Sequence, residues 1–303
     1  MSNLMESVEQ SCDSADAPCS AIETILSPRV ADLGGFSVRR LLPTAKRKMV
    51  GPWIFFDEMG PADFPAGQGI NVLPHPHIGL ATVTYLFEGE ILHRDSVGSC
   101  QPIRTGDINL MVAGSGIAHS ERERPEITAT DHRLHGLQLW LALPETDEET
   151  APAFHHYSND DIPSLEIDGV PVRVMIGSAY GVTSPVPQFC KTLYLEATLE
   201  AGQTLTLPEA PERAVYIASG ALKAHGSELP THSMTVFSSE PGVAITATED
   251  ARIAVIGGEP LGKRFIEWNF VSSSKARIDQ AREDWRAGRF EKVVGDEEAF
   301  IPY

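Results

Sequence analysis

The sequence has few basic residues, and this shortage narrows the range of functions. Among 303 residues, 24 are Lys or Arg and 42 are Asp or Glu, which gives a formal net charge of −18. Such a negative field repels a phosphate backbone. The only dense basic run, residues 45–48, is short enough to be a solvated loop. We therefore expect no direct binding to nucleic acid.

Cysteine motifs and long apolar runs are also missing. The four cysteines, Cys12, Cys19, Cys100 and Cys190, form no CxxC pair, so neither a zinc ribbon nor a disulfide scaffold is indicated. No apolar stretch approaches the roughly 20 residues of a membrane span. The first thirty residues lack the basic start and apolar run of a signal peptide. We expect a cytoplasmic protein that does not associate with membranes.

Glycine and proline, by contrast, are plentiful, with 25 and 22 residues. They punctuate short alternating segments from residue 31 to about 142, a pattern typical of antiparallel β-structure. We expect a hairpin over Leu80–Asp95 and a strand over Gly136–Leu143, with three leucines on one face and Gln and Trp on the other. The acidic segment Leu143–Pro152 is interpreted as the edge of a linker. A second run of strands follows over residues 170–257.

The two halves of the chain contain similar segments. Residues 85–89 (YLFEG) resemble residues 216–220 (YIASG), and each lies in a strand–turn–strand context. Closely spaced strands in both halves favour barrels or sandwiches, an all-β fold class. One amphipathic helix is predicted over Ser274–Arg289. We expect a disordered tail over residues 1–27, a first domain over 28–150 and a second over 151–303 that ends in this helix.

Two motifs carry candidate metal ligands. His75 and His77 lie in NVLPHPHIGL, and His119 and Glu121 lie in GSGIAHSERE. Alternate side chains of a strand point to the same face, so each pair can present two ligands to one interior point. Three imidazoles and a carboxylate suit iron, zinc, copper, nickel or cobalt rather than calcium or magnesium. We interpret six other histidines as surface or hydrogen-bonded residues: His132, His135, His155, His156, His225 and His232.

These motifs resemble those of the pirin family of cupin proteins. HPHIGLATVTYLFEGEILHRDS and AGSGIAHSERE are similar to the family signature, and the resemblance continues through GPWIFFDEMGP and LHGLQLWLALP. It covers most of the chain from about residue 30 and is closer in the first half. The resemblance implies a bicupin, with two antiparallel jelly-roll β-barrels. It also implies one Fe(II) per chain in the first barrel, held by His75, His77, His119 and Glu121.

The resemblance also implies candidate activities. Some family members cleave flavonols such as quercetin with dioxygen, which would make this chain an Fe(II)-dependent quercetin 2,3-dioxygenase. Dioxygen and an aromatic small molecule would then be its substrates, and Glu121 would serve as ligand and catalytic base. One alternative is a non-catalytic, redox-responsive regulatory protein that binds a transcription factor or metabolic enzyme through its iron-bearing domain. Another is a different cupin reaction, such as decarboxylation or isomerisation.

The chain departs from the family pattern next to the first histidine pair. It has HPHIGLA where family members commonly have HPHRGFE, so Ile78 replaces an arginine and Ala81 replaces a glutamate. If the strand that carries His75 and His77 continued regularly, residue 81 would share their parity. We then expect Ala81 to line the metal cavity and Ile78 to face the opposite side.

The second half lacks the metal motif. Aligning the two repeated segments without gaps places Thr206 and Pro208 where the first histidine pair stands. Neither side chain can replace an imidazole. We expect a metal-free, structural second barrel whose interior is lined by apolar residues from strands such as Thr192–Leu199 and Ala214–Ser219.

Overall fold

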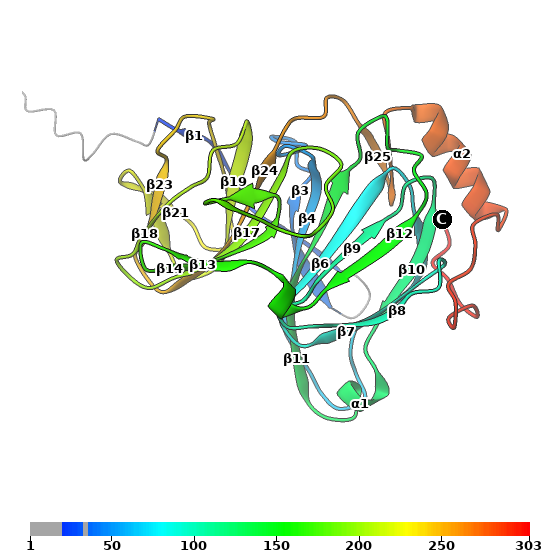
Figure 1. Ribbon diagram of the computed structural model, residues 1–303. Helices are drawn as coiled ribbons and strands as arrows, with labels where there is room; N and C mark the ends of the chain where they lie inside the picture. The colour runs from blue at the N-terminus through cyan, green and yellow to red at the C-terminus, as the bar shows by residue number, and fades with distance from the viewer. Residues whose placement is uncertain (1–19, 33–35) are drawn as a thin grey trace, which may run out of the picture.

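The computed structural model describes residues 20–32 and 36–303, and it shows two β-sheet units that lie side by side (Figure 1). Each unit contains one seven-stranded and one four-stranded sheet. Neighbouring strands within these sheets pair antiparallel. The two-layer arrangement allows each sheet to bury one face against the other.

The first unit is built mainly from the first half of the chain. Its larger sheet has the order β12 (Ala153–Tyr157), β9 (Ile108–Val112), β6 (Leu80–Glu88), β11 (His132–Ala142), β4 (Trp53–Phe64), β3 (Ser37–Leu42) and β2 (Arg29–Asp32). Its smaller sheet has the order β5 (Asn71–His77), β10 (Ile117–Arg122), β7 (Glu90–Asp95) and β8 (Cys100–Arg104). The short helix α1 (Pro125–Thr128) joins β10 to β11. Leu86 and Leu134 of the larger sheet pack against Ile91 and Ile103 of the smaller one.

The second unit repeats this plan. Its larger sheet has the order β1 (Ile22–Leu26), β22 (Met234–Phe237), β19 (Glu212–Ser219), β24 (Ala251–Gly258), β17 (Thr192–Leu199), β14 (Val170–Ile176) and β13 (Ser164–Ile167). Its smaller sheet has the order β18 (Thr204–Thr206), β23 (Ala244–Ala247), β20 (Leu222–Ala224) and β21 (Ser227–Leu229). Two short strands, β15 (Ser178–Ala179) and β16 (Val182–Thr183), pair separately, and a 3-10 turn, η1 (Asn159–Asp161), follows β12.

The interior of the second unit is apolar, as predicted. Leu193 and Leu195 of β17 and Val215 and Ile217 of β19 are buried in one cluster with residues of the smaller sheet, including Leu205. Alternate residues of these strands face this interior, which is the period-2 pattern that the sequence predicts.

The two larger sheets pack against each other and join the units. Leu137, Leu139 and Leu141 of β11 share one buried cluster with Tyr194 of β17 and Tyr216 of β19. The predicted facing of this strand is therefore confirmed for its three leucines. Their burial removes apolar surface of both units from water, which favours a fixed contact between them.

The expected hairpin over Leu80–Asp95 does not form, although both of its strands do. β6 pairs with β9 and β11, whereas β7 pairs with β8 and β10. The turn at Gly89, which has a φ of +96°, therefore carries the chain from the larger sheet to the smaller one. Alternation in sequence identified the strands, but it contains no information about which sheet each strand joins.

Segments near the predicted domain boundaries cross between the units. Strand β12 lies beyond residue 150 and pairs with β9 of the first unit. Strand β1 pairs with β22 of the second unit, so the predicted disordered tail over residues 1–27 is wrong for β1. The rest of that prediction, for residues 1–19 with Cys12 and Cys19, lies outside the described residues.

The C-terminal segment packs on the first unit. Strands β25 (Phe265–Glu267) and β26 (Phe270–Ser272) form a hairpin, and helix α2 (Lys275–Arg286) follows within the predicted range (Figure 1). Ile278 and Ala281 of α2 are buried against Phe270 and Ile78. The helix is therefore a packing helix, as its apolar stripe indicates.

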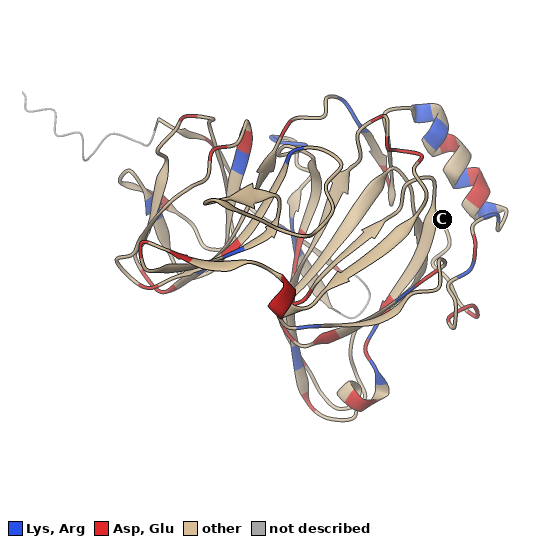
Figure 2. Ribbon diagram, viewed as in Figure 1, with Lys and Arg blue, Asp and Glu red and all other residues tan. Residues whose placement is uncertain are grey.

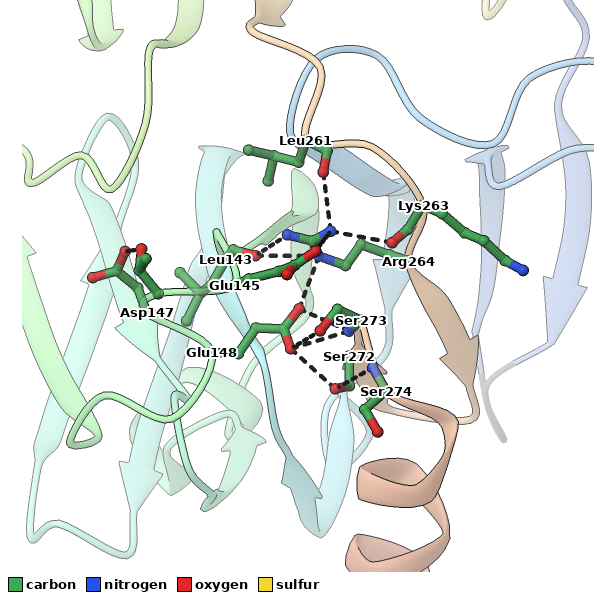
Figure 3. Close-up of polar contacts among 11 residues, drawn as sticks. Leu143, Glu145, Asp147, Glu148, Leu261, Lys263, Arg264, Ser272, Ser273 and Ser274 are labelled. Atoms are coloured by element: carbon green, nitrogen blue, oxygen red, sulfur yellow. Dashed lines mark hydrogen bonds and ion pairs between the residues drawn. The ribbon is translucent and has the colours of Figure 1, made fainter.

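A buried ion pair fastens this segment to the acidic loop after β11 (Figure 3). Arg264 Nε lies 2.8 Å from Glu148 Oε1, and both side chains are almost fully buried. Arg264 Nη2 donates to the carbonyl of Leu143 at 3.1 Å, and Glu148 Oε2 accepts from the hydroxyls of Ser272 and Ser273. Because these hydrogen bonds compensate the buried charges, residues 143–152 form a packed loop rather than a free linker.

Acidic and basic residues are interspersed along α2 (Figure 2). Within the described residues, no helix is long and apolar enough to cross a membrane. The expected lack of nucleic-acid binding and the cytoplasmic location stay predictions.

Candidate metal centre

Three of the predicted ligands meet on the smaller sheet of the first unit. Strands β5 and β10 are antiparallel neighbours, with His75 opposite His119. One ring nitrogen from each of His75, His77 and His119 lies within 4.8 Å of the others, and all three residues are buried. In the part of the chain that the structure describes, this is the only group of three or more His, Cys, Asp or Glu residues with such spacing.

Hydrogen bonds orient two of the imidazole rings. Nδ1 of His75 lies 2.9 Å from the carbonyl oxygen of Leu73, and Nδ1 of His77 lies 3.1 Å from that of Asn269. Because a carbonyl oxygen only accepts, each Nδ1 carries the proton, and each Nε2 presents a lone pair. Asn269 belongs to the turn between β25 and β26, so the C-terminal segment helps to fix His77.

A fourth histidine orients the third ring. His93 Nε2 donates to Asp95 Oδ2 at 3.0 Å, while the other oxygen of Asp95 accepts the amide of Ser99 at 2.8 Å. In the neutral ring this leaves Nδ1 of His93 unprotonated, and it faces Nδ1 of His119 at 3.5 Å. A proton on Nδ1 of His119 satisfies this contact and leaves its Nε2 free. Such outer carboxylate–histidine contacts commonly orient metal ligands.

The distances and protonation states fit a divalent transition metal. Nε2 of His77 and Nε2 of His119 are 3.1 Å apart, and on the tautomers above both carry lone pairs. Two ligands at right angles, each about 2.1 Å from one ion, are separated by about 3.0 Å. Burial lowers the pKa of His75 to about 4 and the pKa values of His77 and His119 well below their usual range. Neutral imidazoles are the form that binds metal.

Glu121 lies in the same cavity on β10. The Thr84 hydroxyl lies 3.3 Å from Oε1 of Glu121 and 2.9 Å from Oε1 of Gln138, so the two acceptors share its one hydrogen. Burial raises the pKa of the Glu121 carboxyl to about 7. Among the described residues, the cluster of ligand atoms within 4.8 Å of one another comprises the three histidines without Glu121. The structure thus places Glu121 at the centre, and its role as fourth ligand stays a prediction.

The cavity in front of the histidines has a volume of about 370 Å³ and aromatic walls. Phe55 and Trp140 of the larger sheet stack with their ring centroids 4.0 Å apart. The guanidinium of Arg40 lies 4.4 Å from the Phe55 centroid and forms two hydrogen bonds with Asp57, at 2.8 and 2.7 Å. Gln138 also lines the cavity, so the predicted second face of β11 is confirmed.

The expectation that Ala81 lines this cavity is wrong. β5 ends at His77, and Gly79, with a φ of +66°, interrupts the extended backbone before β6 begins in the other sheet. Ala81 is buried in the cluster between the two units, whereas Thr84 reaches the metal centre. Ile78 packs beneath α2 and is no ligand. Residue 81 therefore faces the contact between the units and not the metal centre.

The sequence reasoning assigned no role to His93. The sequence nevertheless contained a pattern that could have identified His93, because His93 and Asp95 have the same i, i+2 spacing as the residue pairs in the two metal motifs. Three other histidines have the hydrogen-bonding roles expected of them. His132 contacts Glu123, His135 contacts Glu58 and His156 contacts Asn109, at 3.2, 3.0 and 2.6 Å.

The fold and the site together define a metal-binding cupin protein with two cupin units. The family model for pirin matches residues 35–141, and the model for the pirin C-terminal cupin domain matches residues 194–291. The chain belongs to the pirin family. The predicted all-β bicupin fold with a C-terminal helix is confirmed.

Individual proteins agree with this assignment. A pirin-like protein of Caulobacter vibrioides is 48% identical over 285 residues, which cover 93% of this chain and 99% of that protein. The solved structure of a quercetin 2,3-dioxygenase from Acinetobacter baumannii has a TM-score of 0.86 at 34% identity, covering 92% of this chain and 94% of that one. A pirin from Escherichia coli, solved with nickel(II), has a TM-score of 0.61 at 19% identity, covering 78% of this chain and 99% of that one. The last match supports the fold alone.

Proposed function

We propose that the protein is an Fe(II)-dependent dioxygenase that cleaves a flavonol such as quercetin. The observation that carries the proposal is the convergence of three buried imidazoles on an aromatic-walled cavity that also contains a carboxylate. The relative from Acinetobacter baumannii, which is named a quercetin 2,3-dioxygenase, supports the choice of reaction.

His75, His77 and His119 would hold the metal through Nε2, and Glu121 would complete the set. A bound divalent metal acts as a Lewis acid and lowers the pKa of a hydroxyl group that it holds. The donor set alone also suits other transition metals. Iron is therefore the part of the proposal that metal analysis must test first.

The side chains around the cavity would bind and orient the substrate. Phe55 and Trp140 offer flat apolar surfaces to a planar ring system. Glu121 would accept the proton of the substrate hydroxyl. Burial of its carboxyl favours proton uptake, and the Thr84 hydroxyl contacts one of its oxygens.

Turnover by metal-loaded protein tests the proposal. Protein loaded with Fe(II) without air is mixed with quercetin and air, and loss of flavonol absorbance is recorded together with uptake of dioxygen. We expect catalytic turnover that Glu121→Gln slows by about 100-fold or more while iron stays bound. A matched variant outside the cavity, Glu228→Gln at an exposed position of the second unit, should not change the rate. Iron-loaded protein without turnover would favour the regulatory alternative.

A further inference from the structure

A second cavity lies at the seam between the two units, outside the metal centre. Its volume is about 460 Å³, and it is lined by Tyr85 and Phe87 of the first unit and by residues of β14, β17 and β24 of the second. Its charged residues are Arg173, Glu196 and Arg252. Cavities between domains that contain a few polar groups are common ligand sites.

Sheet register places these three side chains on one face. Arg173 of β14 is the direct partner of Glu196 on β17, and Arg252 of β24 is the direct partner of Thr198. Directly opposed residues of antiparallel strands share a face, and so do residues two apart on one strand. The glutamate therefore lies between two arginines, on the face that the second unit turns toward the first.

Neither arginine has an ion pair with a carboxylate among the described residues. Arg173 donates to the carbonyls of Gly106 and Asn159, at 2.9 and 3.1 Å, and to the Tyr85 hydroxyl at 3.2 Å. The guanidinium of Arg252 lies 5.0 Å from the Phe87 ring centroid and has no hydrogen bond in the described structure. In a chain with an excess of acidic residues, two such arginines in one cavity indicate a site for an anion.

Glu196 provides a second recognition group. The residue is 5% exposed, and Oε1 accepts a hydrogen bond from the hydroxyl of Tyr194 at 2.5 Å. Oε2 has no hydrogen-bond partner among the described residues, and Glu196 lines the cavity. Burial raises the pKa of this carboxyl to about 8. A ligand hydroxyl can donate to the ionised form or accept from the protonated form, whereas an ammonium group requires the ionised form.

We propose that the seam cavity binds a small hydroxycarboxylate. Its carboxylate contacts the guanidinium groups of Arg252 and Arg173, and its hydroxyl contacts Glu196. Phe87 and Tyr85 form the apolar wall against which the carbon chain lies. The site is separate from the metal cavity and does not depend on the proposed dioxygenase activity.

Calorimetric titration of the metal-loaded, full-length protein with L-malate tests this site, with succinate as the matched acid without a hydroxyl. We expect malate to bind about tenfold or more tightly than succinate, because the hydroxyl adds a charge-assisted hydrogen bond. Glu196→Leu should remove this preference. Arg252→Gln should lower the affinity for malate about tenfold or more, and Arg252→Lys should lower it less. Arg286→Gln on α2 should not change the affinity for malate.

A hydroxy acid also binds metals, so His77→Ala separates the two sites. Malate affinity that survives His77→Ala and falls in Arg252→Gln supports the seam site. Affinity that falls in His77→Ala and survives Arg252→Gln places malate at the metal and overturns the proposal. Equal affinity for malate and succinate, or binding of neither at millimolar concentration, overturns it as well. Thermal melting of each variant verifies folding, and Arg173→Gln replaces any variant that does not fold.

Discussion

The two units of the protein have the same arrangement of sheets, but different side chains lie between those sheets. In each unit a seven-stranded sheet faces a four-stranded sheet. The second unit is filled with apolar side chains. The first buries three metal-site histidines, Glu121 and the His93–Asp95 pair on strands of its smaller sheet. Burial of polar groups costs free energy unless each has a partner, so the first unit must provide partners that the second does not need.

The difference shows how one architecture can accommodate a polar centre. In the first unit, backbone carbonyls and the Asp95 carboxylate bind the buried histidines, and the proposed metal would bind three of them. A separate apolar cluster with Leu86, Ile91 and Leu134 lies between the same two sheets. Different residues are therefore responsible for folding stability and for metal binding, so mutations should change one of these properties without the other.

The largest expected effect is the loss of metal from the first unit. Replacing His77 by Ala removes one of three imidazoles, and metal affinity should fall by more than the roughly 100-fold that loss of an outer partner can cause. Metal content after purification without chelator measures this. His225→Ala is the matched control, because His225 is exposed between β20 and β21 of the second unit. Far-UV dichroism should stay unchanged, and unfolding of the metal-free variant would instead show that the metal is structural.

The next prediction concerns a substitution in the contact between the units. Ala81→Glu introduces a carboxylate into the buried cluster that joins them. An unpaired buried charge should lower the free energy of unfolding by about 3 kcal/mol or more. Chemical denaturation measures this change, and Ala129→Glu at an exposed position is the control. Metal affinity should stay the same. An altered metal affinity together with unchanged stability would instead show that residue 81 lines the metal cavity.

Sequence reasoning succeeded where the evidence is local. Alternate side chains of one strand share a face, so the spacing of His75 and His77, and of His119 and Glu121, was sufficient to group them. The same rule gave the two faces of β11. These inferences need no knowledge of which strands are neighbours.

Sequence reasoning failed where the answer depends on pairing between distant segments. The parity argument for Ala81 crossed Gly79, where one strand ends and another begins. Alternation on both sides of Gly89 predicts a hairpin there, because it does not distinguish pairing within a sheet from a change of sheet. The role of His93 depends on the register of β7 against β10, in which His93 lies opposite Glu121. The assignment of β1 to the second unit and of β12 to the first also depends on pairing with strands that are distant in sequence.

A smaller effect concerns the apolar interior of the second unit. Leu195 is fully buried there, so Leu195→Ala should lower the free energy of unfolding by about 2–5 kcal/mol through lost burial and a residual cavity. The metal content of folded protein should not change, since β17 provides no ligand. Thermal melting and metal analysis of the same sample measure both quantities. Loss of metal from folded Leu195→Ala protein would show that the two units are coupled more closely than their separate interiors suggest.

The smallest effect probes the contact that orients His119. Asp95→Asn keeps the size of the side chain and removes its charge. The new amide nitrogen can face His93 Nε2, which then must accept rather than donate. His93 Nδ1 would be protonated in that case and would no longer accept from Nδ1 of His119. Metal affinity, measured by competition with a coloured chelator, should weaken by about 10- to 100-fold.

The absorption spectrum of cobalt(II)-loaded Asp95→Asn protein provides a second readout of the same contact. The spectrum should shift, because the ligand field changes when one ring loses its orientation. Asp107→Asn is the control, since Asp107 accepts backbone amides of Arg104 and Asn159 away from the metal. Wild-type affinity and an unchanged cobalt spectrum in Asp95→Asn would mean that His119 holds its orientation without the His93–Asp95 pair.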